Sequence, residues 1–215
     1  MKKTVSIFLN NFIAVFVPYA WLKMMLSAGG LLSSSGWGAI KYFTVQSNLF
    51  MGATSLLALV IMLTGKSVPR WAARLKYIAT VAVALTFTAV VAFLGHVYGY
   101  KMMFSGANLW LHLFIPVAAI VDYAFFFDAP RLKLSDTFLA FIPEISYGAL
   151  YLINLLINGR GEWPNTNDWY GFLNWGSYIG LAISAGMFLT TWGIAAGLRA
   201  LNGRTSKYDA SPGGA

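Results

Sequence analysis

Six long apolar segments, separated by short polar connections, make up most of the chain. They cover approximately residues 5–28, 39–64, 75–99, 108–127, 134–158 and 175–199. Each is close to the roughly 20 residues that a helix needs to cross the hydrocarbon core of a bilayer. The pattern therefore predicts an all-α polytopic membrane protein with six transmembrane helices. We expect a single domain over residues 1–202 and a flexible tail over residues 203–215.

The N-terminus MKKTVSIFLNNFIAVF has the basic start of a secretory signal. Its apolar run continues to about residue 28 without a convincing small-x-small cleavage site, so we expect it to be retained as the first span.

Only 10% of the 215 residues are charged, against about 25% in a typical soluble domain. Cys is absent, which excludes disulfides, thiolate metal sites and cysteine nucleophiles.

The basic residues are distributed unevenly between the two sides of the predicted bundle. Eleven of the fifteen Lys and Arg, Lys76 among them, fall near the segment ends on the side that holds both termini. By the positive-inside rule, both termini are predicted to be cytoplasmic. The formal charge of +8 then reflects topology and attraction to anionic lipid, not a nucleic-acid surface. We expect a multi-pass protein of a bacterial cytoplasmic membrane, with membrane lipids as its partners.

Polar residues interrupt the second and fourth spans at a similar depth. In KYFTVQSNLF (41–50), Ser47 and Asn48 follow Thr44 by three and four residues and share its helix face. In the fourth span, Asn108, His112 and Pro116 repeat every four residues. Thr44 and His112 are each four or five residues below the outer end of their spans, roughly 6–8 Å.

The fifth span carries a polar stripe, and Tyr151 in that stripe is near the level of Thr44 and His112. Hydrocarbon does not solvate such groups, so we expect them to line a common pocket in the outer half of the membrane. The predicted pocket residues are Ser47, Asn48, His96, Asn108, Glu144, Tyr147 and Tyr151. Asp122 is about 15 Å deeper than His112 and is interpreted as a structural pair or cap. The loop 160–175 is rich in Trp and Tyr, which is typical of an interfacial belt or of a lid over the pocket.

These residue types favour acyl transfer among the chemistries considered. Two His in different spans and few carboxylates at one depth argue against a metal site, and no phosphate-binding or dinucleotide motif is present. We therefore expect no cofactor. A hydroxyl becomes a nucleophile when a base takes its proton, and His112 is suited to serve Thr44 in this way. Asn48, Asn108 or Tyr151 would then stabilise the oxyanion.

KYFTVQSNLF (41–50) and NLWLHLFIPVAAIVDYAFFF (108–127) resemble the signature of a bacterial six-span integral membrane family. The resemblance extends to SYGALYLINLLINGRGEW (146–163) and DWYGFLNW (168–175). These bacterial proteins are distantly similar to the androgen-induced and androgen-dependent membrane proteins. Those are intramembrane threonine hydrolases that cleave fatty acid esters of hydroxy fatty acids. The resemblance implies that Thr44 and His112 form the catalytic pair.

The sequence thus predicts an intramembrane hydrolase of fatty acyl esters with a threonine nucleophile, whose substrate is a lipid ester. One alternative is a small transporter or lipid-binding protein whose polar path is centred on Glu144; such a protein would depend most on that residue. Another is an assembly subunit that uses the aromatic loop 160–175 as a docking surface.

Overall fold

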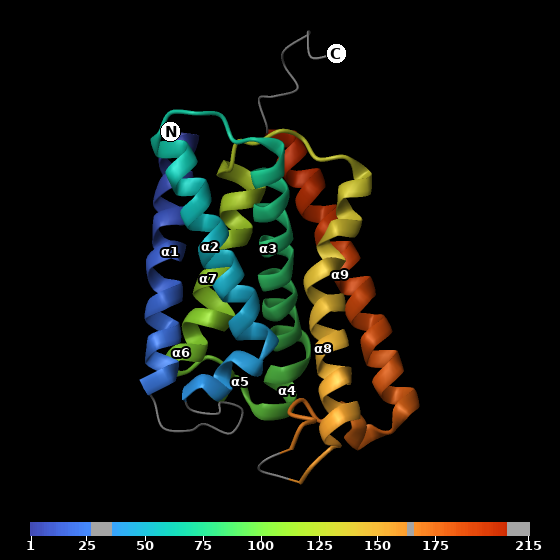
Figure 1. Cartoon of the computed structure of the whole chain (residues 1–215). Coiled ribbons are helices and arrows are strands. Elements are labelled where there is room, and N and C mark those ends of the chain that lie inside the picture. The colour runs from blue at the N-terminus through green and yellow to red at the C-terminus, as the bar shows by residue number, and fades with distance from the viewer. Residues whose placement is uncertain (27–35, 163–165, 206–215) are drawn as a thin grey trace.

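The computed structural model describes residues 1–26, 36–162 and 166–205, which form a bundle of long helices (Figure 1). Within these ranges the regular secondary structure is helical, as predicted. The helical spans long and apolar enough to cross a membrane are Lys2–Leu26, Phe43–Leu63, Arg70–Tyr98, Gly106–Phe126, Leu134–Asn158 and Tyr178–Arg204. Their number and order are as predicted from the apolar pattern. The last helix continues to Thr205, three residues beyond the predicted domain end.

The spans are built from the following elements. The first two are the single helices α1 (Lys2–Leu26) and α2 (Phe43–Leu63). The third joins α3 (Arg70–Ala89), the π-helical η2 (Val90–Leu94) and α4 (Gly95–Tyr98). The fourth joins α6 (Gly106–Leu109), the π-helical η3 (Trp110–Phe114), α7 (Ile115–Val121) and the π-helical η4 (Asp122–Phe126). The fifth joins the 3₁₀-helical η5 (Leu134–Phe141) and α8 (Ile142–Asn158), and the sixth is α9 (Ser177–Thr205). The connections contain the short helices η1 (Gly36–Lys41), α5 (Tyr100–Met103) and η6 (Phe172–Trp175).

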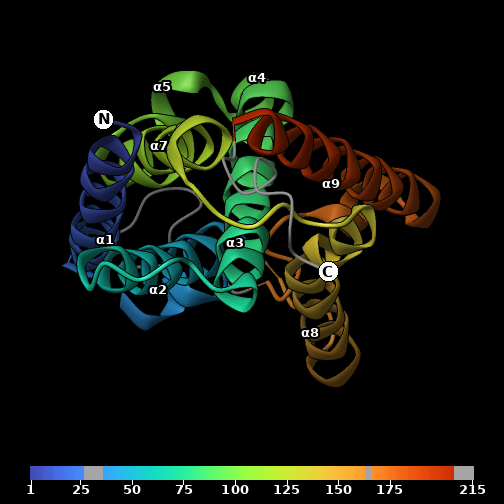
Figure 2. The same ribbon diagram turned by 90° about the horizontal axis from the view of Figure 1, so that it is seen from above.

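The helix α3 stands at the centre of the bundle, with α1, α2 and α7 on one side and α8 and α9 on the other (Figure 2). In the third span 61% of the most apolar window is buried, but only 17% in the fifth span and 11% in the sixth. Figure 2 also shows α8 and α9 pointing away from each other. The first four spans thus form a packed core, and the last two lie against it with most of their surface free.

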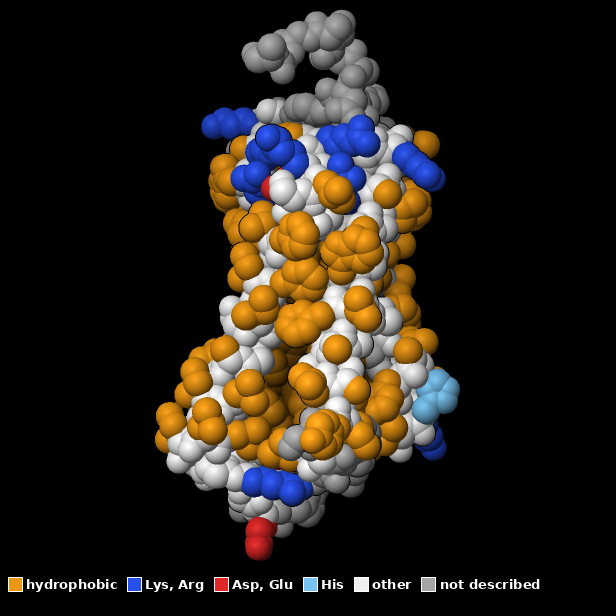
Figure 3. All heavy atoms as spheres, turned by 90° about the vertical axis from the view of Figure 1, so that its right-hand side faces the viewer, with side chains coloured by type: hydrophobic (Ala, Val, Ile, Leu, Met, Phe, Trp, Pro, Cys, Tyr) orange, Lys and Arg blue, Asp and Glu red, His pale blue; other side chains and the backbone are white. Residues whose placement is uncertain are grey.

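The two ends of the bundle differ in composition. The end that holds the N-terminus and the start of α3 carries most of the Lys and Arg (Figure 3); it is called the basic end below. The opposite end carries η1, the 99–105 connection and the loop 166–176, with Tyr42, Trp169 and Tyr170, and is called the aromatic end. One cation that the sequence analysis counts among those near the segment ends lies inside the bundle. The Lys76 side chain is fully buried between helices.

In each π-helical segment a backbone N–H donates to a carbonyl one residue further back than it would in an α-helix. The N–H groups of Gly95, Ile115 and Phe127 reach back five residues, to the carbonyls of Val90, Trp110 and Asp122. In an α-helix each of these N–H groups would donate to the carbonyl four residues back. The carbonyls of Val91, Leu111 and Tyr123 therefore lose their usual donor.

A side chain supplies the missing donor in all three places. The Tyr100 hydroxyl donates to Val91 O at 2.7 Å, Asn48 Nδ2 to Leu111 O at 3.1 Å, and Asn202 Nδ2 to Tyr123 O at 2.7 Å. Buried backbone carbonyls are costly to leave unpaired, above all in a membrane. The two asparagines thereby fasten α2 and α9 to opposite halves of the fourth span.

Candidate functional site

Thr44 lies in the first turn of α2, where the chain enters the bundle from the aromatic end. Tyr42, just before the helix, is extended, and the first helical N–H, that of Phe43, donates to the Tyr170 hydroxyl at 2.9 Å. The Thr44 side chain is half-buried. Among the described residues, its hydroxyl and its own N–H make no hydrogen bond. The start of α2 therefore presents an uncommitted hydroxyl next to an uncommitted amide.

Asn48 brings the backbone of Thr44 and that of the fourth span together. Its Nδ2 donates to Thr44 O at 2.7 Å and to Leu111 O at 3.1 Å. Two carbonyl oxygens within hydrogen-bonding distance of one nitrogen must be close to each other. Because Leu111 immediately precedes His112, the Asn48 amide joins the helix turn of Thr44 to the helix turn of His112.

The π turn around His112 explains why an asparagine is needed at position 48. Ile115 N–H bonds to Trp110 O, and the next residue, Pro116, has no N–H to offer. Leu111 O is therefore left without a backbone donor and accepts from Asn48 instead. Since both amide hydrogens of Asn48 are engaged, its side chain offers the site only an oxygen. That buried Oδ1 has no hydrogen-bond partner among the described residues.

The imidazole of His112 is buried and held in one tautomer. Its Nδ1 is 2.8 Å from the carbonyl oxygen of Met103, at the end of α5. A carbonyl oxygen only accepts, so Nδ1 must carry the hydrogen. In the neutral ring Nε2 then has a free lone pair, and no hydrogen bond to it is made within the described ranges. This is the arrangement that a general base requires.

The other polar residues of the second and fourth spans lie around this pair. The Ser47 hydroxyl donates to Thr44 O at 3.1 Å and is 3.3 Å from the Thr86 hydroxyl of α3. Asn108, one turn before His112, is half-buried, and its side chain makes no hydrogen bond to other described residues. Its amide is thus available as a donor, unlike that of Asn48.

Tyr147 and Tyr151 face the aromatic loop. The Tyr147 hydroxyl donates to Lys41 O at 2.8 Å and accepts from Trp169 Nε1 at 2.9 Å. The Tyr151 hydroxyl donates to Asp168. The hydrogen of each phenol is therefore committed to holding α8 and the loop against the start of α2.

Asp168 organises this loop, a role that the sequence analysis missed. Its buried carboxylate accepts the Phe172 and Leu173 N–H groups, each at 3.0 Å, and pairs with Arg160 at 3.8 Å. Burial raises the pKa of the neighbouring Tyr170 phenol well above its usual value, which keeps it neutral beside the Phe43 N–H. The described part of the loop sits over residues 41–43 and contacts α8.

Two predicted pocket residues lie outside this cluster. His96 is exposed, with its Nδ1 3.1 Å from the hydroxyl of Tyr100 one turn on. Glu144 is buried nearer the basic end, where its Oε2 accepts from the Thr191 hydroxyl of α9 at 2.7 Å. The structure thus links Thr44, Ser47 and Asn48 to the turn of His112 by hydrogen bonds to backbone carbonyls, and places Glu144 at a separate contact between α8 and α9.

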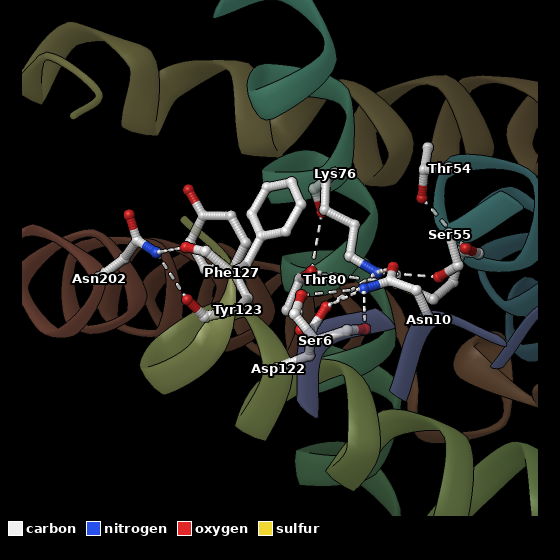
Figure 4. A network of polar contacts seen from close by, with 11 residues as sticks. Ser6, Asn10, Thr54, Ser55, Lys76, Thr80, Asp122, Tyr123, Phe127 and Asn202 are labelled. Atoms are coloured by element: carbon white, nitrogen blue, oxygen red, sulfur yellow. Dashed lines mark hydrogen bonds and ion pairs between the residues drawn. The ribbon is translucent and has the colours of Figure 1, made fainter. Parts of the chain in front are cut away.

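A second polar cluster lies in the basic half of the bundle, around the ion pair of Lys76 and Asp122 (Figure 4). Lys76 Nζ donates to Asn10 Oδ1 at 2.6 Å and to Ser55 Oγ at 2.8 Å, and is 3.5 Å from Asp122 Oδ2. Asp122 also accepts from Ser6 at 2.6 Å and from Asn10 at 2.7 Å. Asp122, interpreted from the sequence as a structural pair or cap, is thus ion-paired, and its partner is a lysine that the sequence analysis placed near a segment end.

No group of three or more His, Asp or Glu that could hold a metal ion occurs among the described residues. Searches with this chain find no matching protein-family model, no matching curated protein and no matching solved structure.

Proposed function

We propose that this protein is an intramembrane hydrolase of lipid esters, in which Thr44 is the nucleophile and His112 the general base. The observation that carries the proposal is the Asn48 amide, which bonds to Thr44 O and to Leu111 O and so holds the two helix turns together. The fixed tautomer of His112 supports it, because Nε2 has a lone pair to accept the threonine proton.

In the proposed reaction, Thr44 Oγ attacks the ester carbonyl carbon while its proton moves to His112 Nε2. The tetrahedral intermediate collapses, the alkoxide leaves and takes that proton, and the acyl group remains on Thr44. Water then attacks the acyl-threonine with His112 as base. The products are a fatty acid and an alcohol, and both residues return to their starting state.

Near Thr44 and one turn before His112, two donors make no hydrogen bond to other described residues and could serve the oxyanion. They are the backbone N–H of Thr44, at the positive end of the α2 dipole, and the side-chain amide of Asn108. Asn48 and Tyr151, the other sequence candidates, have their hydrogens engaged with carbonyl and carboxylate acceptors. We therefore assign the oxyanion role to Thr44 N–H and Asn108.

The arrangement of α8 and α9 supports entry of a lipid from the side. These helices separate from each other, and the face that they form is hollowed between apolar side chains (Figures 2 and 3). An acyl chain can lie there without leaving an apolar environment, which accounts for a hydrolytic site buried in a bundle. In this proposal the protein lies in a bacterial cytoplasmic membrane, with its basic end and both termini on the cytoplasmic side.

The test is hydrolysis of medium- and long-chain acyl esters by the protein purified in detergent. Thr44→Ala and His112→Ala are compared with matched controls in the same molecule. Thr54→Ala removes another α2 threonine, which bonds back to Met51 O, and His96→Ala removes the exposed histidine. We expect the first two variants to lose at least about 100-fold in rate, and both controls to keep theirs.

The same assay separates the alternatives. Glu144 is a buried carboxylate in an apolar span with Thr191 as its hydrogen-bond partner, as expected of a residue on a transport path. If Thr44→Ala and His112→Ala matched wild type and only Glu144→Gln impaired lipid binding or flux, the transporter hypothesis would replace the hydrolase. If none of the variants changed turnover or flux, an assembly role for the aromatic loop would be favoured.

A further inference from the structure

The ammonium group of Lys41 lies at the aromatic end, three residues before Thr44. Its Nζ is 5.4 Å from the centroid of the Trp169 ring and 5.5 Å from that of Tyr42. No carboxylate among the described residues lies within ion-pairing distance of it. By contrast, Arg160 in the same region pairs with Asp168 at 3.8 Å. Lys41 is therefore a cation held between aromatic rings without a negative partner in the described chain.

The surroundings of Lys41 favour an incoming anion. Burial lowers the pKa of Lys41 below the ordinary lysine value, because part of its hydration is lost. A bound anion would compensate for that loss. Most other basic residues lie at the opposite end (Figure 3), so Lys41 is a local positive charge on a weakly charged face.

Lys41 is also fixed relative to the candidate catalytic residue. The Tyr147 hydroxyl donates to Lys41 O at 2.8 Å and accepts from Trp169 Nε1 at 2.9 Å, so the ring beneath the ammonium and the backbone of residue 41 share one anchor. Chain geometry limits the Cα atoms of Lys41 and Thr44 to roughly 11 Å apart. A single lipid molecule can span that distance.

We propose that Lys41 binds an anionic group, carboxylate or phosphate, on the acyl ester whose carbonyl reaches Thr44. Lys41 is thereby assigned as the residue that selects for a negative charge on the lipid ester. The part of this inference that concerns the ester rests on the proposed hydrolase function. The part that concerns anion binding does not.

Binding is tested without turnover, by the shift in thermal unfolding midpoint in a neutral detergent. The probes are octanoate, octyl phosphate and uncharged 1-octanol. Wild type and Lys41→Arg should be stabilised by at least one anionic probe, and Lys41→Gln should need about tenfold more of it. Lys101→Gln, which removes an exposed lysine of the same end, should behave as wild type. Stabilisation by octanoate would identify a carboxylate as the bound group, and stabilisation by octyl phosphate would identify a phosphate.

Hydrolysis is then compared for an acyl ester that bears a free carboxylate and for the same ester with that carboxylate capped as an amide. Lys41→Gln should raise KM for the charged ester about tenfold with kcat within twofold, and leave the capped ester unaffected. If the anionic probes stabilise Lys41→Gln as well as wild type, or stabilise neither, the proposal is wrong. If binding depends on Lys41 but no ester is cleaved, the anion site stands and the hydrolase function fails.

Discussion

The two polar clusters inside this bundle differ in how completely their hydrogen bonds are made. Around Lys76 and Asp122, three acceptors surround the three ammonium hydrogens, and both carboxylate oxygens have donors. Around Thr44 and His112, an acceptor nitrogen, a hydroxyl and a backbone N–H are uncommitted within the described chain. The buried Oδ1 of Asn48 also lacks a partner among the residues that the structure describes.

The completeness of hydrogen bonding distinguishes polar residues that hold helices together from polar residues that are available for chemistry. A saturated cluster has no hydrogen bond left for a ligand, and it joins α1, α2, α3 and η4 into one unit. An open cluster is unfavourable in lipid unless something binds there. The hydrogen-bonded cluster of Lys76 and Asp122 thereby positions the helices that carry Thr44 and His112.

The largest expected effect comes from breaking the ion pair on one side only. Lys76→Met or Asp122→Leu leaves an uncompensated buried charge and should lower the free energy of unfolding by about 3–5 kcal/mol. The double variant removes both charges and should recover most of that loss. Unfolding in detergent measures the three values. If a single variant had the stability of wild type but lost turnover, Lys76 and Asp122 would have a role in the reaction and not only in folding.

Asn48→Leu removes both bonds that link Thr44 O to Leu111 O. It should lower the free energy of unfolding by about 1–3 kcal/mol, because the carbonyl next to the π turn is left unpaired. Turnover per folded molecule should fall as well, since Thr44 and His112 are no longer held together. Loss of stability with full turnover would show that Asn48 does not position the pair.

Asn202→Leu makes the equivalent change at the other π turn of the same span, where Asn202 bonds to Tyr123 O and Phe127 O. The loss of stability should again be about 1–3 kcal/mol. The rate per folded molecule should stay at the wild-type value because this contact lies by the basic end. The ratio of rate loss to stability loss for Asn48→Leu and Asn202→Leu therefore compares the two regions directly.

Tyr170→Phe should have the smallest effect. It removes the hydroxyl that accepts the Phe43 N–H at 2.9 Å and also interacts with Tyr147, and it keeps the ring contacts of the aromatic loop. The expected loss of stability is about 0.5–1.5 kcal/mol, measured by thermal unfolding beside Tyr178→Phe, whose ring is exposed. A larger loss than that of Asn48→Leu would mean that the loop, not the fourth span, fixes the start of α2.

The six spans were predictable because each apolar run is long enough to cross a bilayer. That Thr44, Ser47, Asn48 and His112 share a level followed from helix periodicity and depth, and in the structure Asn48 links the turn of Thr44 to the turn of His112. The pocket role of Glu144 and His96 also rested on depth, which does not determine the direction in which a side chain points. Glu144 instead bonds to α9, and His96 lies on the exposed flank.

Other features depend on contacts that periodicity does not encode. By sequence position Lys76 groups with the cations near the segment ends, yet its ammonium group is directed inward at Asp122. An ionisable residue in an apolar span is usually paired with another polar or charged group, and a search for a partner of Asp122 would have pointed to Lys76. The π turn at His112 is signalled only by Pro116, and the loop role of Asp168 arises from backbone N–H groups.

The most direct test of the account is to trap the acyl group on Thr44. An activated aryl ester of a long-chain acid accelerates the first step, so the acyl form should accumulate and survive an acid quench. Peptide mass spectrometry should then find the acyl mass on Thr44 in wild type, and much less of it in His112→Ala. Turnover with the acyl group on another residue, or with none on the protein, would contradict the account.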